Sequence, residues 1–131
     1  MVIKPTNKIY LNKSLIHGYG VFTSQPIEEG ETIEICPVID MGMSIGESSH
    51  ILIDYRFNWP QGPNPEKQVI AAGYAMMYNH SDTPNANWRS NYSENCFEFY
   101  ATKKIESNEE IFVWYGDQNY WNDGRTHTVI V

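Results

Sequence analysis

Hydrophobic and polar residues alternate in short runs along much of this chain, and turn-forming residues separate the runs. In Thr32 to Ile35 and in Phe97 to Tyr100, apolar and polar positions alternate over part of the run, as in a β-strand with one face in water. The pattern therefore predicts a mostly β fold. Its expected strands are Ile9 to Leu11, Gly20 to Thr23, Thr32 to Cys36, His50 to Phe57, Cys96 to Thr102 and Ile111 to Tyr115.

One segment carries the signals of a helix. It begins at Pro65 and ends at Gly73, and helices favour Pro in their first turn and Gly just past their end. The stretches Met41 to Ser49 and Asn58 to Pro65 are rich in Gly, Ser, Pro and Asn, which predicts surface loops. Because the 131 residues show no break in composition, we expect one domain over 1–131, with a loose N-terminus at 1–8.

Two turns in the chain share one pattern. The segment Ile27 to Ile33 is matched by Ile105 to Ile111, and Gly30 and Asn108 fall at the same place in the two segments. Gly and Asn are the residue types that best tolerate a left-handed backbone, so we expect a positive φ at both positions. A common turn used twice explains the match more simply than a duplication does.

The charge of the chain bounds its partners. With 9 Lys and Arg against 16 Asp and Glu the net charge is −7, and no basic patch is visible, so direct nucleic-acid binding is not expected. An acidic surface suits a basic protein or peptide, although acidic residues also serve solubility alone.

No apolar run is long enough to span a membrane and no signal peptide is visible, which predicts a soluble intracellular protein. Cys36 and Cys96 lie far apart with no His at ligand spacing, which predicts buried thiols and no metal site.

Three segments concentrate side chains that are suited to chemistry. Tyr78 to Asn85 holds Asn, His, Ser, Asp and Pro together, Glu110 to Asp117 ends in an aromatic pair and a Gly, and His17 to Phe22 places glycines around a tyrosine. Each segment also has a plain structural interpretation, namely a rigid turn, core packing before a turn, and a close-approach loop. None of the three decides the function alone.

In this order, the segments together resemble the signature of the SET-domain protein-lysine methyltransferases. The resemblance covers most of the chain, and its length and its ending at Asp117 to Trp121 are most similar to the minimal stand-alone SET proteins of viruses. It is carried by Gly18-Tyr19-Gly20, Ile27 to Ile35, Asn79-His80-Ser81, Pro84-Asn85, Glu109-Glu110-Ile111 and Tyr115-Gly116. It implies several small β-sheets with one or two short helices. It also implies a knot-like threading of the segment after Tyr115 past residues 79–85.

The resemblance implies S-adenosyl-L-methionine as the methyl donor. The backbone of Gly18, Tyr19 and Gly20 is expected to lie against it, and Asn79 and His80 to bind its amino-acid and adenine parts. A purely structural His80 is the alternative. Trp121 follows at a distance where the family often places an aromatic side chain over the adenine, and C-terminal packing is its other interpretation.

Tyr115 occupies the position of the family's catalytic tyrosine, whose hydroxyl orients the lysine amine and the methyl group. Methyl transfer is an in-line displacement by a neutral amine, so alignment supplies much of the rate and the lysine must first lose its proton. An apolar aromatic channel lowers the pKa of that lysine by desolvation, while aromatic faces and phenol oxygens stabilise the polarised methyl group. Tyr55 and Trp88 are predicted to line the channel, with core or surface packing as the alternative for each.

The large enzymes of the family often carry zinc-binding Cys clusters, which this chain lacks. Closure of the lysine channel is then expected from residues 117–131 or from a partner subunit. The end of the chain, Thr126 to Val131, is β-prone and is hypothesised to pair across a homodimer. A basic substrate such as a histone tail suits the negative charge, in the cytoplasm or nucleus of a cell or infected host.

The alternative function is a protein-binding module of the PR-domain kind, which keeps the fold without turnover. The segment Val113 to Gly116 resembles the PR-domain form of the last motif. The pair Asn79-His80 and the presence of Tyr115 favour an active enzyme, because many PR domains lack the Asn-His pair.

Overall fold

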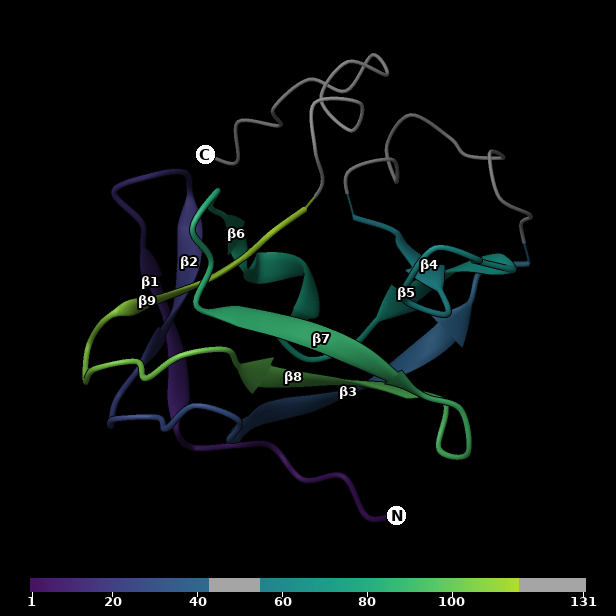
Figure 1. Cartoon of the computed structure of the whole chain (residues 1–131), viewed down its shortest axis with the longest axis horizontal. Helices are drawn as coiled ribbons and strands as arrows, with labels where there is room; N and C mark the ends of the chain where they lie inside the picture. Colours follow the sequence, from purple (N-terminus) through teal and green to yellow (C-terminus); the bar gives the residue numbers. More distant parts are fainter. Residues whose placement is uncertain (43–54, 116–131) are drawn as a thin grey trace.

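In the part of the chain that the structure describes, short strands build two β-sheets (Figure 1). The computed structural model describes residues 1–42 and 55–115. One sheet has the strand order β1-β2-β9-β6, and the other has the order β4-β5-β3-β8-β7. The elements are β1 (Ile9–Lys13), β2 (Tyr19–Thr23), β3 (Thr32–Asp40), β4 (Phe57–Trp59), β5 (Lys67–Ala71), the 3₁₀ helix η1 (Ala75–Met77), β6 (Asn79–His80), β7 (Ala86–Asn91), β8 (Cys96–Ala101) and β9 (Glu110–Val113). The predicted mostly β fold is therefore confirmed, and η1 is a short helix at a place where the sequence did not predict one.

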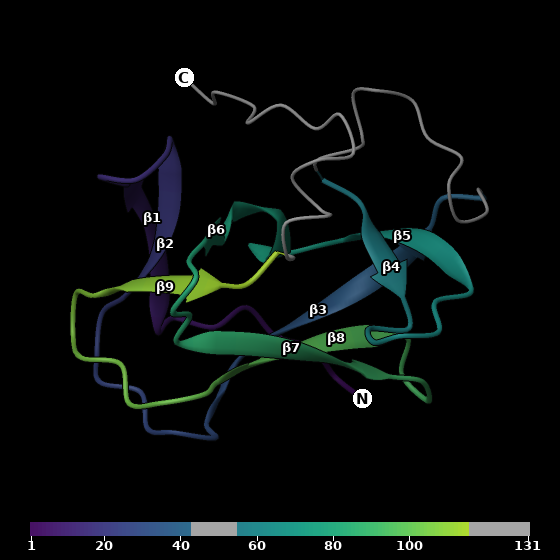
Figure 2. The same cartoon turned by 45° about the horizontal axis from the view of Figure 1, so that its top comes forward.

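The core lies on one face of the layer formed by β3, β8 and β7, and Figure 2 shows β9 and β6 above this layer. Trp88 pairs with Phe99 across β7 and β8, so both side chains project from the same face of the sheet. The fully buried Phe99 ring stacks on Tyr78, with ring centroids 4.7 Å apart and an interplanar angle of 16°. Tyr78 directly precedes β6, so this stacking attaches β6 to the sheet below it. Burial of each such side chain contributes about 1.5–3 kcal/mol.

The helix predicted from Pro65 to Gly73 is wrong, because this segment forms β5. The run is short and apolar, and such a run fits either a helix or a buried strand. Here it pairs with β3 on one side and with β4 on the other, which gives its backbone groups partners on both edges. Gly73 lies in the turn after β5, which ends at Ala71, and it has a φ of +71°.

Other strand bounds also differ from the prediction, and the strand expected to end at Tyr115 ends at Val113. The strand expected from His50 to Phe57 begins only at Phe57 among the described residues, since positions 55 and 56 are not strand and positions 50–54 lie outside the described ranges. The loop expected from Asn58 to Pro65 starts later, because β4 extends to Trp59. Strand β7 was not predicted at all. Its signal was an alternation of buried Ala86 and Trp88 with exposed Asn87 and Arg89.

The two matching turns have the predicted backbone, and they bond to each other. The φ angle is +84° at Gly30 and +67° at Asn108, which confirms the left-handed positions. Ile27 and Ile105 form an antiparallel bridge between the turns, with each amide donating to the other residue's carbonyl at 2.8 Å. Both isoleucines are fully buried, so the paired turns close one end of the core.

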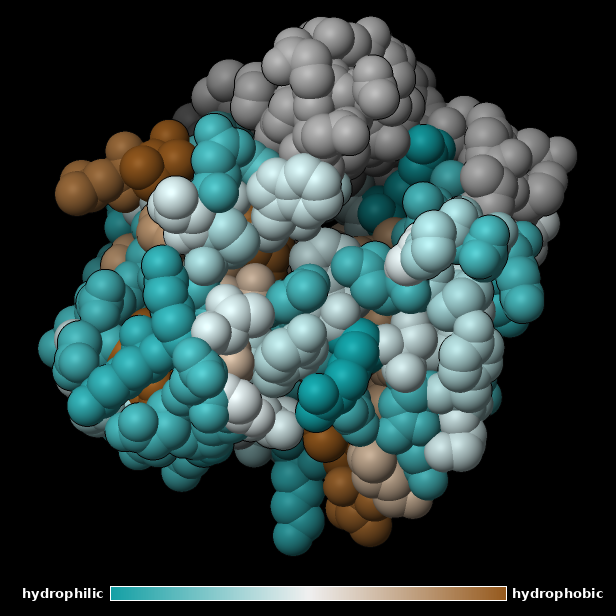
Figure 3. All heavy atoms as spheres, in the orientation of Figure 1, coloured by the Kyte–Doolittle hydropathy of each residue, from teal (hydrophilic) through white to brown (hydrophobic). Residues whose placement is uncertain are grey.

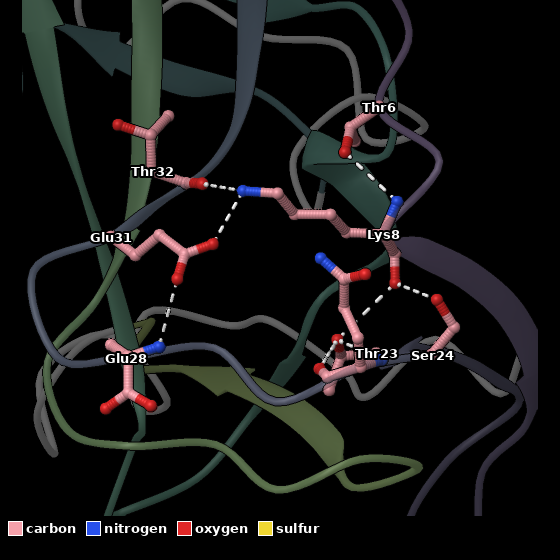
Figure 4. A network of polar contacts seen from close by, with 8 residues as sticks. Thr6, Lys8, Thr23, Ser24, Glu28, Glu31 and Thr32 are labelled. Carbon is pink, nitrogen blue, oxygen red and sulfur yellow. Dashed lines mark hydrogen bonds and ion pairs between the residues drawn. The ribbon is translucent and has the colours of Figure 1, made fainter.

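A polar network holds the start of β1 against the first of these turns (Figure 4). The Lys8 ammonium donates to Glu31 at 2.6 Å and to the Thr32 carbonyl at 3.2 Å. The other Glu31 oxygen accepts from the Glu28 amide at 3.1 Å, and the Lys8 carbonyl accepts from the Ser24 hydroxyl at 2.8 Å. The hydrogen bond from Lys8 lowers the pKa of Glu31. One ion pair therefore joins the N-terminal strand to the turn that leads into β3.

Cys36 and Cys96 are both buried and free, as predicted. They sit at neighbouring positions of the β3–β8 ladder, where Cys36 pairs with Phe97 and Cys96 pairs with Pro37. Across residues 1–42 and 55–115, the structure has no helix with the length and apolar character to cross a membrane.

Candidate functional site

Parallel pairing of β6 with β9 brings two of the sequence motifs together. Asn79 lies opposite Phe112 in this pair. Asn85 locks the turn after β6 onto β9, because its side-chain amide donates to the Glu110 carbonyl at 3.0 Å and its oxygen accepts from the Phe112 amide at 2.8 Å. The predicted threading of the chain past this turn falls on residues 116–131, which lie outside the described residues, as does Trp121.

Tyr115 lies directly beside the Asn79-His80 pair. Its backbone amide donates to His80 Nδ1 at 2.8 Å, and the two rings have centroids 5.4 Å apart. Its hydroxyl donates to the Tyr78 carbonyl. Because Nδ1 of His80 accepts a hydrogen bond, the ring proton belongs on Nε2, which faces the Asp82 carboxylate at 3.0 Å. Main chain and side chain of Tyr115 are thus both tied to the segment that carries the Asn-His motif.

A cavity of about 150 Å³ opens at Tyr115. Tyr55 and Trp88, the predicted channel residues, line it together with Tyr115. Trp88 is only 8% exposed, so it serves mainly as a wall of the cavity. The remaining lining residues are Arg56, Phe57, Asn58, Gln61, Ala75, Met76 and Val113. The structure therefore gathers three of the predicted site residues around one small, partly aromatic space.

The glycine-containing hairpin between β1 and β2 forms the other side of the site. Gly18 has a φ of +48°, and its carbonyl accepts from the Ser14 amide at 2.7 Å, which closes the turn. Gly20 is buried, and a Cβ placed on it would lie 2.3 Å from Glu110 Oε2. The hairpin end exposes Leu15 completely and 66% of Ile16, seen as the apolar projection in Figure 3. Tyr19 is 42% exposed, so it is open to a ligand.

Asn79 joins the hairpin to β9. Its side-chain nitrogen lies 3.0 Å from the His17 carbonyl, 3.3 Å from the Tyr19 carbonyl and 2.9 Å from Glu110 Oε2. All three neighbours are acceptors, so the nitrogen and not the oxygen of the amide faces them. The side chain is 6% exposed. The three motifs of the sequence thus converge on one amide group.

Glu34, which sequence reasoning missed, supports the Tyr115 side of the site through Tyr78. The Tyr78 hydroxyl donates to the Glu34 carboxylate at 2.6 Å, and the Tyr74 amide donates to the same carboxylate at 3.4 Å. In sequence, Glu34 has the pattern of a solvent-facing residue. A bulge in β3 between Thr32 and Glu34 places Glu34 opposite the buried Phe99, on the inner face. No sequence signal marked this bulge.

Burial raises the pKa of the Glu34 carboxyl, although the hydrogen bonds from Tyr78 and Tyr74 partly oppose this effect. A raised folded-state pKa means that the stabilisation from Glu34 is full below its unfolded pKa and is lost as the pH rises through the folded pKa. The variant Glu34→Gln, which does not titrate, is therefore expected to gain stability relative to wild type as the pH rises above 4.5, the ordinary pKa of a glutamate carboxyl.

Thermal or urea unfolding between about pH 3 and about pH 8 measures the difference. Glu98→Gln is the matched control, because hydrogen bonds from Arg89 and Asn91 lower the pKa of Glu98. Its stabilisation is present above its unfolded pKa and is lost as the pH falls through the folded pKa, so Glu98→Gln should lose stability relative to wild type as the pH rises toward 4.5. A pH-independent difference for Glu34→Gln would contradict the raised pKa of Glu34.

Comparisons with known proteins agree with this arrangement. The sequence pattern of the SET domain matches residues 18–116. The chain is 33% identical over 109 residues to the Schizosaccharomyces pombe histone-lysine N-methyltransferase specific for H3 lysine-37, covering 81% of this chain and 71% of the yeast protein. Among solved structures, a candidate histone methyltransferase of Plasmodium falciparum superposes with a TM-score of 0.68 at 33% identity, covering 89% of this chain and 99% of the other.

A chain of the ctPRC2 complex with H3K27me3 and H3K27M is a more distant match. It has a TM-score of 0.62 and 26% identity, and the match covers 83% of this chain but 14% of the larger one. Fold, motif order and sequence identity therefore agree, and the chain belongs to the SET-domain family of protein-lysine N-methyltransferases.

Proposed function

We propose that this chain transfers a methyl group from S-adenosyl-L-methionine to a lysine of a basic protein, a histone tail being the first candidate, with Tyr115 as its catalytic residue. The observation that carries the proposal is the position of Tyr115, at a partly aromatic cavity and in direct contact with the Asn79-His80 segment. Relatives named as histone methyltransferases support the substrate class. A basic tail also suits the net charge of −7.

The residues around Asn79 fit the proposed methyl donor. With its nitrogen turned to three acceptors, Asn79 keeps its oxygen as an acceptor for a ligand ammonium group. Gly18, Tyr19 and Gly20 would hold the donor with their backbone, and His80 would bind beside them. Trp121, outside the described residues, would cover the adenine. When bound, the donor supplies a methyl group on a positively charged sulfonium.

The cavity is suited to a lysine side chain. Its aromatic walls, Tyr55, Trp88 and Tyr115, favour the neutral amine by desolvation, and they also attract the lysine stem. The Tyr115 hydroxyl donates a hydrogen bond to the Tyr78 carbonyl, so the hydroxyl oxygen is left to accept a hydrogen bond from the lysine amine. This is the orientation that an in-line transfer requires. We place this activity in the cytoplasm or nucleus of a cell or infected host.

The test is incubation of the full chain with labelled S-adenosyl-L-methionine and a panel of histones, ribosomal proteins and acidic proteins. We expect label on lysine in the basic proteins, with histone tails strongest, and binding of the unlabelled donor by calorimetry. Absence of donor binding would refute the proposal and favour the protein-binding module that Val113 to Gly116 resembles. Donor binding with label on ribosomal proteins alone would refute the histone assignment and leave the reaction standing.

A further inference from the structure

Glu110, the first residue of β9, joins three separate parts of the site. Its Oε1 accepts a hydrogen bond from the Ser14 hydroxyl at 2.7 Å, in the hairpin between β1 and β2. Its Oε2 accepts from the Asn79 side-chain amide at 2.9 Å, at the start of β6. Gly20 packs so closely against the carboxylate that a Cβ would overlap it. The carboxylate is therefore held by two hydrogen bonds and by the close packing of Gly20.

The position of the Glu110 carboxylate requires a group that accepts hydrogen bonds and donates none, because Ser14 and Asn79 both donate to it. The Ser14 hydroxyl already accepts from the Ile16 amide at 3.0 Å, so its own proton is directed to Glu110. Of the three acceptors around the Asn79 nitrogen, two are backbone carbonyls and Glu110 is the carboxylate, which is the strongest acceptor. An ionised carboxylate accepts at both oxygens, whereas an amide would present a donor to one of the two partners.

The orientation of Asn79 has a consequence for the bound donor. The side-chain amide of Asn79 has a nitrogen end and an oxygen end, and its three neighbouring acceptors all lie at the nitrogen end. Among the described residues, Asn79 Oδ1 accepts no hydrogen bond, although the residue is only 6% exposed. An acceptor fixed in this way is suited to a primary ammonium group, and it would repel a carboxylate.

We propose that Glu110 is a positioning residue of the donor site, whose carboxylate fixes the Asn79 amide so that Oδ1 receives the α-amino group of the methyl donor. This inference rests on the proposed function, since it assumes that the donor binds at Asn79. Glu110 itself does not touch the donor. Without the carboxylate, the Asn79 amide is free to turn, and its oxygen is no longer held toward the ammonium group.

The experiment compares two ligands that cannot react, S-adenosylhomocysteine and its derivative in which hydrogen replaces the α-amino group. Their affinities are measured by calorimetry for wild type and for Glu110→Ala. In wild type, loss of a charge-assisted hydrogen bond should weaken binding roughly ten-fold or more. In Glu110→Ala, the ratio of the two affinities should fall to within about three-fold, since Asn79 no longer presents a fixed acceptor.

Controls separate positioning from general loss of structure. Glu109→Ala removes the neighbouring exposed carboxylate, which accepts from the Glu106 amide at 2.7 Å, and should leave the ratio of affinities unchanged. If Glu110→Ala does not fold, Glu110→Met keeps the length of the side chain without the oxygens and takes its place. A melting curve of each variant accompanies the binding data.

The outcomes distinguish this inference from the function on which it rests. If wild type binds neither ligand, the proposed donor site fails. If wild type binds both ligands with equal affinity, or if the ratio in the Glu110 variant matches that of wild type, the positioning role is overturned while the methyltransferase assignment stands. A ratio that collapses only in the Glu110 variant supports the role.

Discussion

Tyr115→Phe is expected to reduce methyl transfer roughly 100-fold or more while changing the affinity for S-adenosyl-L-methionine by no more than about three-fold. The substitution removes the hydroxyl that bonds to the Tyr78 carbonyl, on a residue that lines the cavity. The ring, its contact with His80 and the backbone bond to His80 Nδ1 all remain. The loss should therefore fall on alignment of the lysine amine and not on binding of the donor.

Initial rates with labelled donor, together with calorimetric binding, separate these two quantities. Tyr100→Phe is the matched control, because Tyr100 lies on β8 outside the cavity and has its ring beneath Arg89, with 4.7 Å between the guanidinium carbon and the ring centroid. It should retain the wild-type rate. Equal labelling by wild type and Tyr115→Phe would remove Tyr115 from its catalytic role.

Gly20→Ala is expected to weaken donor binding by roughly 10- to 100-fold and to lower the free energy of unfolding by about 1–3 kcal/mol. The new methyl group would lie 2.3 Å from Glu110 Oε2 and 3.1 Å from Asn79 Nδ2. Glu110 has a flexible side chain, but its displacement breaks the hydrogen bonds to Ser14 and Asn79. The single methyl group thereby disturbs the hairpin and the amide that are both expected to hold the donor.

A double-mutant cycle with Glu110→Ala tests this cause. If the clash with the carboxylate accounts for the loss, Gly20→Ala should change donor affinity by no more than about two-fold in the Glu110→Ala background, where the carboxylate is absent. The effects of the two substitutions on affinity would then not add, as expected of residues in contact. Calorimetry on the four proteins gives the coupling energy. Additive effects would show that Gly20 acts through the backbone and not through Glu110.

Alternation and β-prone runs in the sequence located β1, β2, β3, β8 and β9, although they did not locate β5, β6 or β7. In Phe97 to Tyr100 the buried and half-buried positions follow the sequence pattern directly, because a β-strand turns successive side chains to opposite faces. The turns at Gly30 and Asn108 were equally predictable, since a left-handed backbone restricts the choice of residue. The motif order carried the family and hence the identity of Tyr115, Asn79 and His80 as site candidates.

The local sequence pattern could not predict which distant segments pair with each other. The segment 67–71 has signals of a helix, and it is a strand because β3 and β4 offer its backbone two sets of hydrogen-bond partners. The parallel pair of β6 and β9 joins residues far apart in the sequence, such as Asn79 and Phe112, and no local signal specifies such a partner.

The sequence by itself determined the mostly β class, the two left-handed turns and the residues that mark the family, because each depends on local backbone preference or on residue identity. Tertiary structure alone decided that a bulge turns Glu34 inward to Tyr78, and that Glu110 meets Ser14 and Asn79. These contacts join strands far apart in the chain, so they arise only when the sheets have formed and buried polar groups must find partners.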